Sequence, residues 1–145
     1  MIILYYIALI LFAVFGVVNF IYLWISKRKY PRGYWLQTAK NIDKFGNREF
    51  RFLWNKTLIK QNEMSVQFGD EMEDETISEV LGYNYRNNTL SLMGKFVVFL
   101  LTPNHCLKAI GKRPIQEEPL TIVLRVATWI TIVLTLIYIG YEITN

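Results

Sequence analysis

The apolar stretch IILYYIALILFAVFGVVNFIYLWI, from Ile2 to Ile25, decides the fold class of this chain. It is 24 residues long, and Asn19 is its one clearly polar side chain. A helix needs about 20 apolar residues to cross about 30 Å of hydrocarbon, so this stretch is long enough to span a bilayer. A secretory signal peptide carries its basic residues first, whereas here they come after the apolar stretch. We therefore expect an uncleaved membrane anchor rather than a signal peptide or a buried core helix.

A second apolar stretch, Leu120 to Tyr141, lies near the other end of the chain and contains one charged residue, Arg125. Its polar edge is at Glu117 and Glu118. A long side chain near a helix end can carry its guanidinium out to the lipid phosphates, so one arginine does not prevent a span. A sharper alternative is that Arg125 pairs with a lipid phosphate or with a carboxylate of a neighbouring subunit. The sequence leaves this choice open.

Three threonines of the second stretch share one helical face at i, i+3 and i+7 spacing: Thr128, Thr131 and Thr135. Hydroxyl groups in an apolar helix bond either to carbonyls of their own helix or across a helix interface. This face is therefore a candidate contact between copies of the chain. We expect a homo-oligomer rather than an isolated pair of spans.

Basic residues flank the inner ends of both stretches, which predicts that the middle of the chain lies on the cytoplasmic side. The predicted lipid-binding residues are Lys27, Arg28, Lys29, Arg32, Lys112, Arg113 and Arg125. The fold class that follows is an all-α integral membrane protein with both termini outside. Transmembrane helices occupy residues 1–26 and 119–142, and a small helical cytoplasmic-side domain with interfacial helices occupies 27–118. The single cysteine, Cys106, excludes an intrachain disulfide and agrees with a reducing compartment.

The net charge of +4 conceals a strong segregation of charge along the chain. Residues 27–60 have a balance of +8, residues 61–82 one of −7, and residues 83–118 one of +3. Opposite blocks attract within a Debye length of about 8 Å, so the acidic block is expected to fold over part of the basic one. The remaining basic residues favour anionic lipid, because no recognised nucleic-acid motif accompanies them. Membrane lipids are therefore the expected partner, and nucleic acid is not.

Between the two apolar stretches, hydrophobic periodicity and turn residues predict a helical domain. The apolar stripe of Thr38–Lys60 predicts one helix, and the polar segment Gln61–Glu73 predicts a loop. A second helix is expected to start within Asp74–Leu81 and to end at an asparagine-rich turn, Gly82–Asn88. Leu90–Leu101 is too short to span a bilayer, so it is expected to be buried or embedded in the membrane interface.

The remaining candidate residues form a structural motif: Asp74, Glu75, Thr76, Ser78, His105 and Cys106. Thr76 and Glu79 have the spacing of a capping box. Adjacent side chains such as His105 and Cys106 point in different directions, so they are unsuited to act as base and nucleophile on each other. One histidine and one cysteine also lack the paired spacing of zinc sites.

We therefore expect Asp74 and Glu75 to cap one helix, and His105 and Cys106 to end another. Hydrogen bonds would then dock these two helix ends against each other. On this interpretation the chain has no catalytic residue, no metal and no cofactor. Metal binding and catalysis at the same residues are the alternatives.

Several short motifs in order resemble a known family. They are NIDKFGN from Asn41 to Asn47, DETISEVLG from Asp74 to Gly82, Arg86 with NNTLSLMGK, and PNHCLKAI from Pro103 to Ile110. Together they resemble a family of small uncharacterised proteins of bacteriophage and prophage genomes, with an Asp-Glu-Thr-x-Ser core and a C-terminal His-Cys motif. The resemblance covers residues 41–110. The acidic segment before Asp74 and the second apolar stretch depart from it. It implies a phage origin and no particular reaction.

The expected function is therefore that of a bacteriophage membrane protein. We favour a structural component of a lipid-containing virion, which links the internal membrane to the capsid and contacts capsid or other virion proteins. The alternative is a phage protein of the bacterial inner membrane, either a holin or a superinfection exclusion factor. An enzyme at the bilayer surface is a third class, for which the sequence shows no catalytic constellation.

Overall fold

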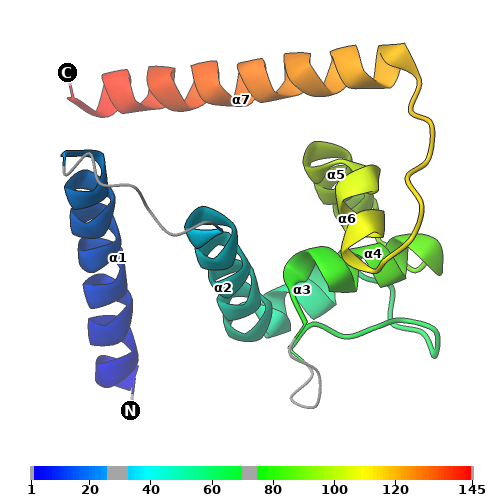
Figure 1. Ribbon diagram of the computed structural model, residues 1–145, viewed down its shortest axis with the longest axis horizontal. Helices are drawn as coiled ribbons and strands as arrows, with labels where there is room; N and C mark the ends of the chain where they lie inside the picture. Colours follow the sequence, from blue (N-terminus) through cyan, green and yellow to red (C-terminus); the bar gives the residue numbers. More distant parts are fainter. Residues whose placement is uncertain (1, 26–32, 70–74, 145) are drawn as a thin grey trace. The chain divides into compact units, whose positions relative to one another are not determined.

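The computed structural model describes residues 2–25, 33–69 and 75–144, and these residues are mostly helical (Figure 1). The helices are α1 (Ile2–Ile25), α2 (Tyr34–Glu49), α3 (Arg51–Thr57), α4 (Ile77–Arg86), α5 (Leu92–Leu101), α6 (Pro103–Ala109) and α7 (Pro119–Thr144). Within the described ranges, β-structure is limited to an isolated antiparallel bridge between Ile59 and Leu90. The all-α prediction is therefore confirmed. The chain divides into two compact units, Met1–Gln37 and Thr38–Asn145, with the boundary inside α2.

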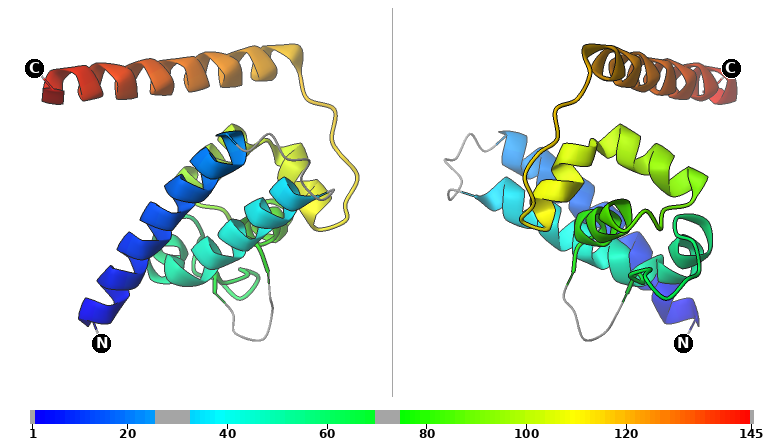
Figure 2. Two further views of the ribbon diagram at one scale, coloured as in Figure 1. Left: turned by 60° about the vertical axis from the view of Figure 1, so that its left-hand side comes forward. Right: turned by 90° about the vertical axis from the view of Figure 1, so that its right-hand side faces the viewer.

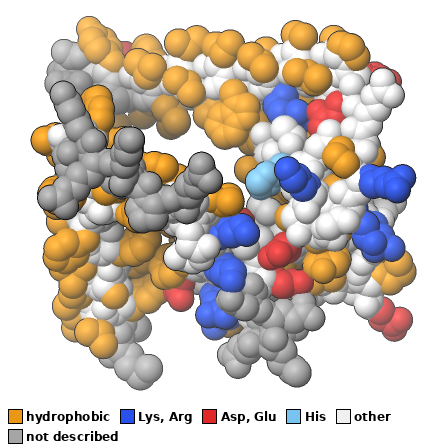
Figure 3. All heavy atoms as spheres, in the orientation of Figure 1, with side chains coloured by type: hydrophobic (Ala, Val, Ile, Leu, Met, Phe, Trp, Pro, Cys, Tyr) orange, Lys and Arg blue, Asp and Glu red, His pale blue; other side chains and the backbone are white. Residues whose placement is uncertain are grey.

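Two of these helices are long and apolar enough to cross a membrane. Ile3–Ile25 has a mean hydropathy of 2.4 and none of it is buried, and Pro119–Ile143 has a mean hydropathy of 2.2 with 6% buried. Hydrophobic side chains cover the visible sides of α1 and α7 (Figure 3). The amide of Asn19, the polar side chain of α1, donates to the Tyr34 hydroxyl at 3.1 Å.

The prediction of a single helix over Thr38–Lys60 was wrong, because the structure has two helices there, α2 and α3. Phe50 separates them with φ −99° and ψ 11°. Asn47 Oδ1 accepts from the Gly69 amide at 3.1 Å, and Asn55 Oδ1 accepts from the Phe68 amide at 2.7 Å. On a straight helix, residues eight apart differ by about 12 Å in height and about 80° in direction. The bend lets both asparagines reach neighbouring amides of the same loop.

Asn84 of α4 holds the other part of this loop. Its Nδ2 donates to the carbonyls of Val66 at 2.7 Å and Val80 at 2.9 Å, and its Oδ1 accepts from the Val66 amide at 3.1 Å. The Thr89 hydroxyl donates to the same oxygen. Asn84 is fully buried, and a carboxamide offers the same donor and acceptor as a peptide group. The predicted loop is thus confirmed over 61–69 and is held by side-chain bonds, while its remaining residues, 70–73, lie outside the described part of the chain.

The core lies where α4, α5 and α6 pack against one another beside α3 (Figures 1 and 2). A Cβ atom added to Gly82 of α4 would lie 2.4 Å from the Cys106 carbonyl oxygen of α6, so these two backbones touch directly. The buried apolar residues are Leu58, Ile59, Phe68, Val80, Leu81, Leu90, Val98, Cys106 and Leu107. They come from α4, α5 and α6 and from the segments that join α3 to α4 and α4 to α5, so this part of the chain has a hydrophobic core of its own.

The capping box of α4 is confirmed. Thr76 Oγ1 accepts from the Glu79 amide at 3.2 Å, and Glu79 Oε2 accepts from the Thr76 amide at 2.7 Å. Helix α4 begins at Ile77 and continues to Arg86, so the turn predicted over Gly82–Asn88 was placed too early. Tertiary contacts explain the longer helix, because Gly82 and Asn84 are both buried against neighbouring elements.

Candidate functional site

A polar cluster joins three helices through the hydroxyl of Ser78 on α4. Ser78 Oγ donates to Asp43 Oδ2 of α2 at 2.9 Å and lies 3.1 Å from His105 Nε2 of α6. Ser78 is buried, Asp43 is half-buried and His105 is exposed. The serine therefore bridges a carboxylate inside the fold and an imidazole at its surface, over sequence separations of 35 and 27 residues.

The order of these groups decides what the cluster can do chemically. A hydroxyl has one hydrogen to donate, and Ser78 donates it to the Asp43 carboxylate. His105 Nε2 must therefore carry a hydrogen of its own and donate it to Ser78 Oγ. In a serine hydrolase the histidine accepts the serine proton, and the carboxylate holds the histidine from its other nitrogen. Here the carboxylate holds the serine instead. This geometry favours a link between helices over an activated nucleophile.

Cys106 lies next to the cluster and is buried. Burial, followed by the negative charge of Asp43, raises the pKa of its thiol to about 11. The thiolate is the nucleophilic and metal-binding form of cysteine, so this thiol is protonated and unreactive at neutral pH. Cys106 therefore behaves as a small apolar core residue.

The structure brings together only part of the motif predicted from the sequence. Ser78 and His105 meet, and Thr76 caps α4. Glu75 lies just before that cap, where its carbonyl accepts from Asn47 Nδ2 at 2.8 Å. Asp74 lies outside the described residues.

His105 and Cys106 were expected to end a helix, and the structure places both within α6. Helix α6 is separate from α5 because Thr102 has φ 73° and Pro103 starts a new turn. Within that helix Thr102 Oγ1 accepts from the His105 amide at 3.1 Å. The change of direction after α5 is what turns His105 toward Ser78.

Asp43 is the member of the cluster that sequence reasoning missed. It precedes Asn47 by one helical turn, and both residues bond to the segment around the start of α4. The signal was present in the NIDKFGN motif, where two polar residues at i and i+4 share one face of an amphipathic helix.

A second polar site joins α5 to α7 through Arg125. Its Nε donates to the Phe99 carbonyl, and its Nη2 forms an ion pair with Glu117 Oε2 at 2.8 Å. The guanidinium also lies over the Phe99 ring, 5.3 Å from its centroid. One turn further along α7, Trp129 Nε1 donates to the Leu100 carbonyl at 3.2 Å. The sequence suggested a lipid phosphate or a carboxylate of a neighbouring subunit for Arg125, whereas the structure gives it partners within its own chain.

The other predicted lipid-binding residues stay predictions. Lys112 and Arg113 are exposed in the segment between α6 and α7, which Asn104 holds through two bonds to the backbone of Ile115 at 2.9 and 2.7 Å. Lys27, Arg28, Lys29 and Arg32 lie outside the described residues. The hydroxyls of Thr128, Thr131 and Thr135 each donate to the carbonyl four residues earlier.

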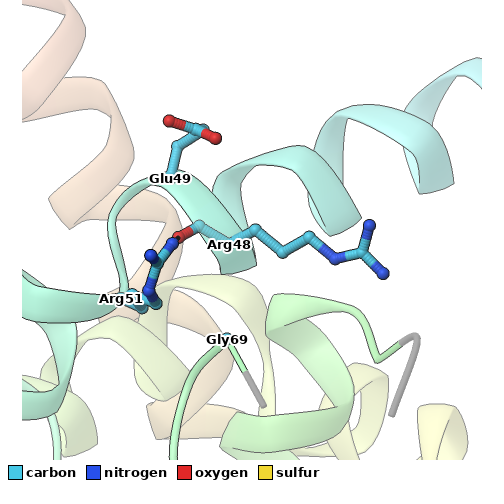
Figure 4. A pocket seen from close by; sticks show the side chains of 4 residues that line it. All are labelled: Arg48, Glu49, Arg51 and Gly69. Carbon is cyan, nitrogen blue, oxygen red and sulfur yellow. Dashed lines mark hydrogen bonds between the residues drawn. The ribbon is translucent and has the colours of Figure 1, made fainter. Parts of the chain in front are cut away.

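A shallow hollow lies near the end of α2, lined by Arg48, Glu49, Arg51 and Gly69 (Figure 4). Arg51 Nη1 donates to the Arg48 carbonyl at 2.6 Å, while the side chains of Arg48 and Glu49 extend in different directions. The polar groups do not converge on one point, so the hollow does not define a ligand site. Among the described residues, no group of three or more histidine, cysteine or acidic side chains is placed to hold a metal ion.

Comparison with known proteins found no match to a protein-family model, to a curated protein or to a solved structure. The fold and the two polar sites are therefore interpreted from their own geometry.

Proposed function

We propose that this chain is an integral membrane protein in which α1 and α7 cross the bilayer. The observation that supports this most is the exposure of these helices, of which 0% and 6% are buried despite their apolar composition. Leaving one large apolar side chain in water rather than burying it costs about 1.5–3 kcal/mol. A core helix of a water-soluble protein is covered by its neighbours, whereas these helices need lipid to cover them.

In this proposal the helical core lies at the membrane surface on the cytoplasmic side. The exposed Lys112 and Arg113 precede α7, and basic residues at 27–29 and 32 follow α1, so the positive-inside tendency puts the end of α1 and the start of α7 on the cytoplasmic side. Both termini then lie outside.

We further propose a structural role rather than an enzymatic one. The polar groups of the core are used to hold its own parts together: Asn84 fixes the 61–69 loop, and Ser78 links Asp43 to His105. Taken with the resemblance of residues 41–110 to small phage proteins, this supports a component of a lipid-containing virion that connects its internal membrane to the capsid. A phage protein of the host inner membrane, either a holin or an exclusion factor, is the alternative role.

Alkaline carbonate extraction and side-specific labelling test membrane insertion and orientation. The variant Lys112→Cys places a thiol at an exposed site, and the parent chain is the matched control because Cys106 is buried with a raised pKa. We expect the chain to stay in the carbonate pellet and the new thiol to react with an impermeant reagent only after the cells are opened. Release into the supernatant would contradict the spans, and labelling of intact cells would reverse the orientation.

The role itself is tested by where the protein accumulates. Recovery of the chain in purified lipid-containing particles supports the virion component. Its absence from particles, together with loss of membrane potential when the chain is expressed, would favour the host-membrane alternative.

A further inference from the structure

Helix α5 has an outward face of large apolar side chains. Leu92 is 87% exposed, Met93 55% and Phe96 45%, whereas Gly94 and Val98 of the same helix are buried against the core. Exposure of this size in a ten-residue helix leaves a continuous apolar strip uncovered by the protein. Lys95 is the one charged residue of α5, and it is exposed as well.

The contacts between α5 and α7 fix how deep this strip would lie. Arg125 and Trp129 bond the carbonyls of Phe99 and Leu100, at the C-terminal end of α5. These two residues lie six and ten positions after Pro119, which is about 9 and 15 Å along a helix. If α7 enters the hydrocarbon at Leu120, the end of α5 lies inside the bilayer; if it enters just after Arg125, that end lies at the headgroup boundary.

The second placement fits the length of α7 and the charge of Arg125. The 18 residues from Val126 to Ile143 are about 27 Å long as a helix, close to the thickness of the hydrocarbon. Their one charged residue, Glu142, lies at the far end of this length, at the level of the opposite headgroups. Arg125 and Glu117 then remain at the level of the headgroups. The last carbonyls of a helix have no hydrogen-bond donor within that helix. The free-energy cost of leaving a carbonyl without a donor rises where water is scarce. Arg125 and Trp129 supply donors to two of these carbonyls.

We infer that α5 lies in the headgroup–acyl boundary of the same bilayer that α7 crosses, with Leu92, Met93 and Phe96 turned toward lipid. Lys95 on the same helix can extend its ammonium to the phosphates, as expected for an interfacial helix on anionic lipid. The occupant of the apolar strip is therefore lipid, and α5 serves as a fixed contact between the core and the membrane surface. This inference rests on the proposed insertion of α7.

Fluorescence quenching in liposomes tests it. The variants Met93→Cys and Glu63→Cys, each labelled with an environment-sensitive dye at pH 7, are placed in phosphatidylcholine–phosphatidylglycerol vesicles. Glu63 is exposed in the 61–69 loop, which lies on the side of the core away from α7 in both figures of the fold (Figures 1 and 2). The unmodified chain measures any labelling of Cys106. Quenchers are a lipid with a nitroxide near the top of its acyl chain, and iodide on both sides of the membrane.

We expect the dye at position 93 to be quenched several-fold more by the lipid nitroxide than by iodide, and the dye at position 63 to show the reverse. Equal quenching of both sites by iodide would overturn the inference. Protection of position 93 from both quenchers would also overturn it, because a second protein copy would then cover the strip. Carbonate extraction of the same variants separates the two proposals: chains that stay in the membrane with position 93 in water refute the inference alone, and chains that are released refute the insertion of α7 as well.

Discussion

Gly94 of α5 packs directly against the backbone carbonyl of Leu58, at the end of α3. A Cβ atom added to Gly94 would lie 2.0 Å from that oxygen, which is far inside van der Waals contact. The Leu58 carbonyl is also fixed, because it accepts from the Ser91 amide at 2.9 Å. Two elements therefore meet through backbone alone at this point, and no side chain there can move aside.

The first prediction concerns this contact. Gly94→Ala should lower the free energy of unfolding by about 3 kcal/mol or more, because overpacking at a rigid contact forces backbone shifts. Gly140→Ala on α7 is the matched control, since nothing lies within 4 Å of its added Cβ. Chemical unfolding in detergent micelles, followed by circular dichroism, measures both. Equal stability of the two variants would show that α5 does not approach Leu58 this closely.

The second prediction concerns the loop held by Asn84. Asn84→Ala should cost about 3 kcal/mol, because the part-buried backbone groups of Val66 lose their partner and the fully buried hydroxyl of Thr89 loses its acceptor. Asn87 makes one exposed bond to the Met64 carbonyl, so Asn87→Ala should cost less than about 1 kcal/mol. Limited proteolysis within 61–69 provides a second measurement. Cleavage that is no faster in Asn84→Ala than in Asn87→Ala would show that the Asn84 side chain does not restrain this loop.

The third prediction concerns Ser78. Ser78→Ala should lower the free energy of unfolding by about 1.5–3 kcal/mol, because the half-buried carboxylate of Asp43 loses its hydroxyl donor. Combining it with Asp43→Asn should cost less than the sum of the two single changes. Unfolding of the three variants in the same micelles measures this coupling. Unchanged stability with complete loss of biological function would instead identify Ser78 as a functional hydroxyl and revive the enzymatic interpretation.

The parts of the fold that could be predicted from the sequence are those governed by local chemistry. Length and composition alone identified α1 and α7. The capping box of Thr76 and Glu79 could be predicted because its two hydrogen bonds join residues three apart in sequence. Turn residues likewise located the loop over 61–69. In each case the interacting groups lie within one helical turn, or the signal is a composition that no tertiary contact alters.

The features that were missed depend on residues far apart in sequence. The break at Phe50 brings Asn47 and Asn55 to one loop, against the apolar periodicity of the segment. The Ser78 hydroxyl donates to Asp43, 35 residues away in sequence, and Arg125 donates to the Phe99 carbonyl, 26 residues away. A charge or a hydroxyl has many suitable partners in a chain of this composition, so only the fold decides which one it meets.

The fourth prediction concerns the junction of α5 and α7. Arg125→Leu should destabilise the chain by about 3–5 kcal/mol, because it leaves the carboxylate of Glu117 nearly buried without its cation. Arg125→Leu with Glu117→Gln should recover part of this loss, whereas Arg113→Gln at an exposed site should have little effect. Unfolding of the parent chain, the two single variants and the double variant in micelles measures the coupling between the two changes. Additive effects of the two changes would mean that the ion pair contributes nothing to holding α7 on α5.

The last prediction concerns the pH dependence that Cys106 gives to stability. Its pKa is raised to about 11 in the folded chain, above the ordinary value of 9.0, so the folded state keeps a proton that the unfolded state loses first. The resulting stabilisation is fully present below pH 9 and disappears as the pH rises through about 11, with a total of about 3 kcal/mol. Lysines and tyrosines also titrate in this range, so the measured quantity is the difference in unfolding free energy between the parent chain and Cys106→Ala from pH 8 to 11. That difference should shrink with rising pH, and iodoacetamide at pH 8 should react much more slowly with the folded chain than with the unfolded one. A constant difference with fast alkylation would place the thiol at the surface and remove it from the core beside Gly82.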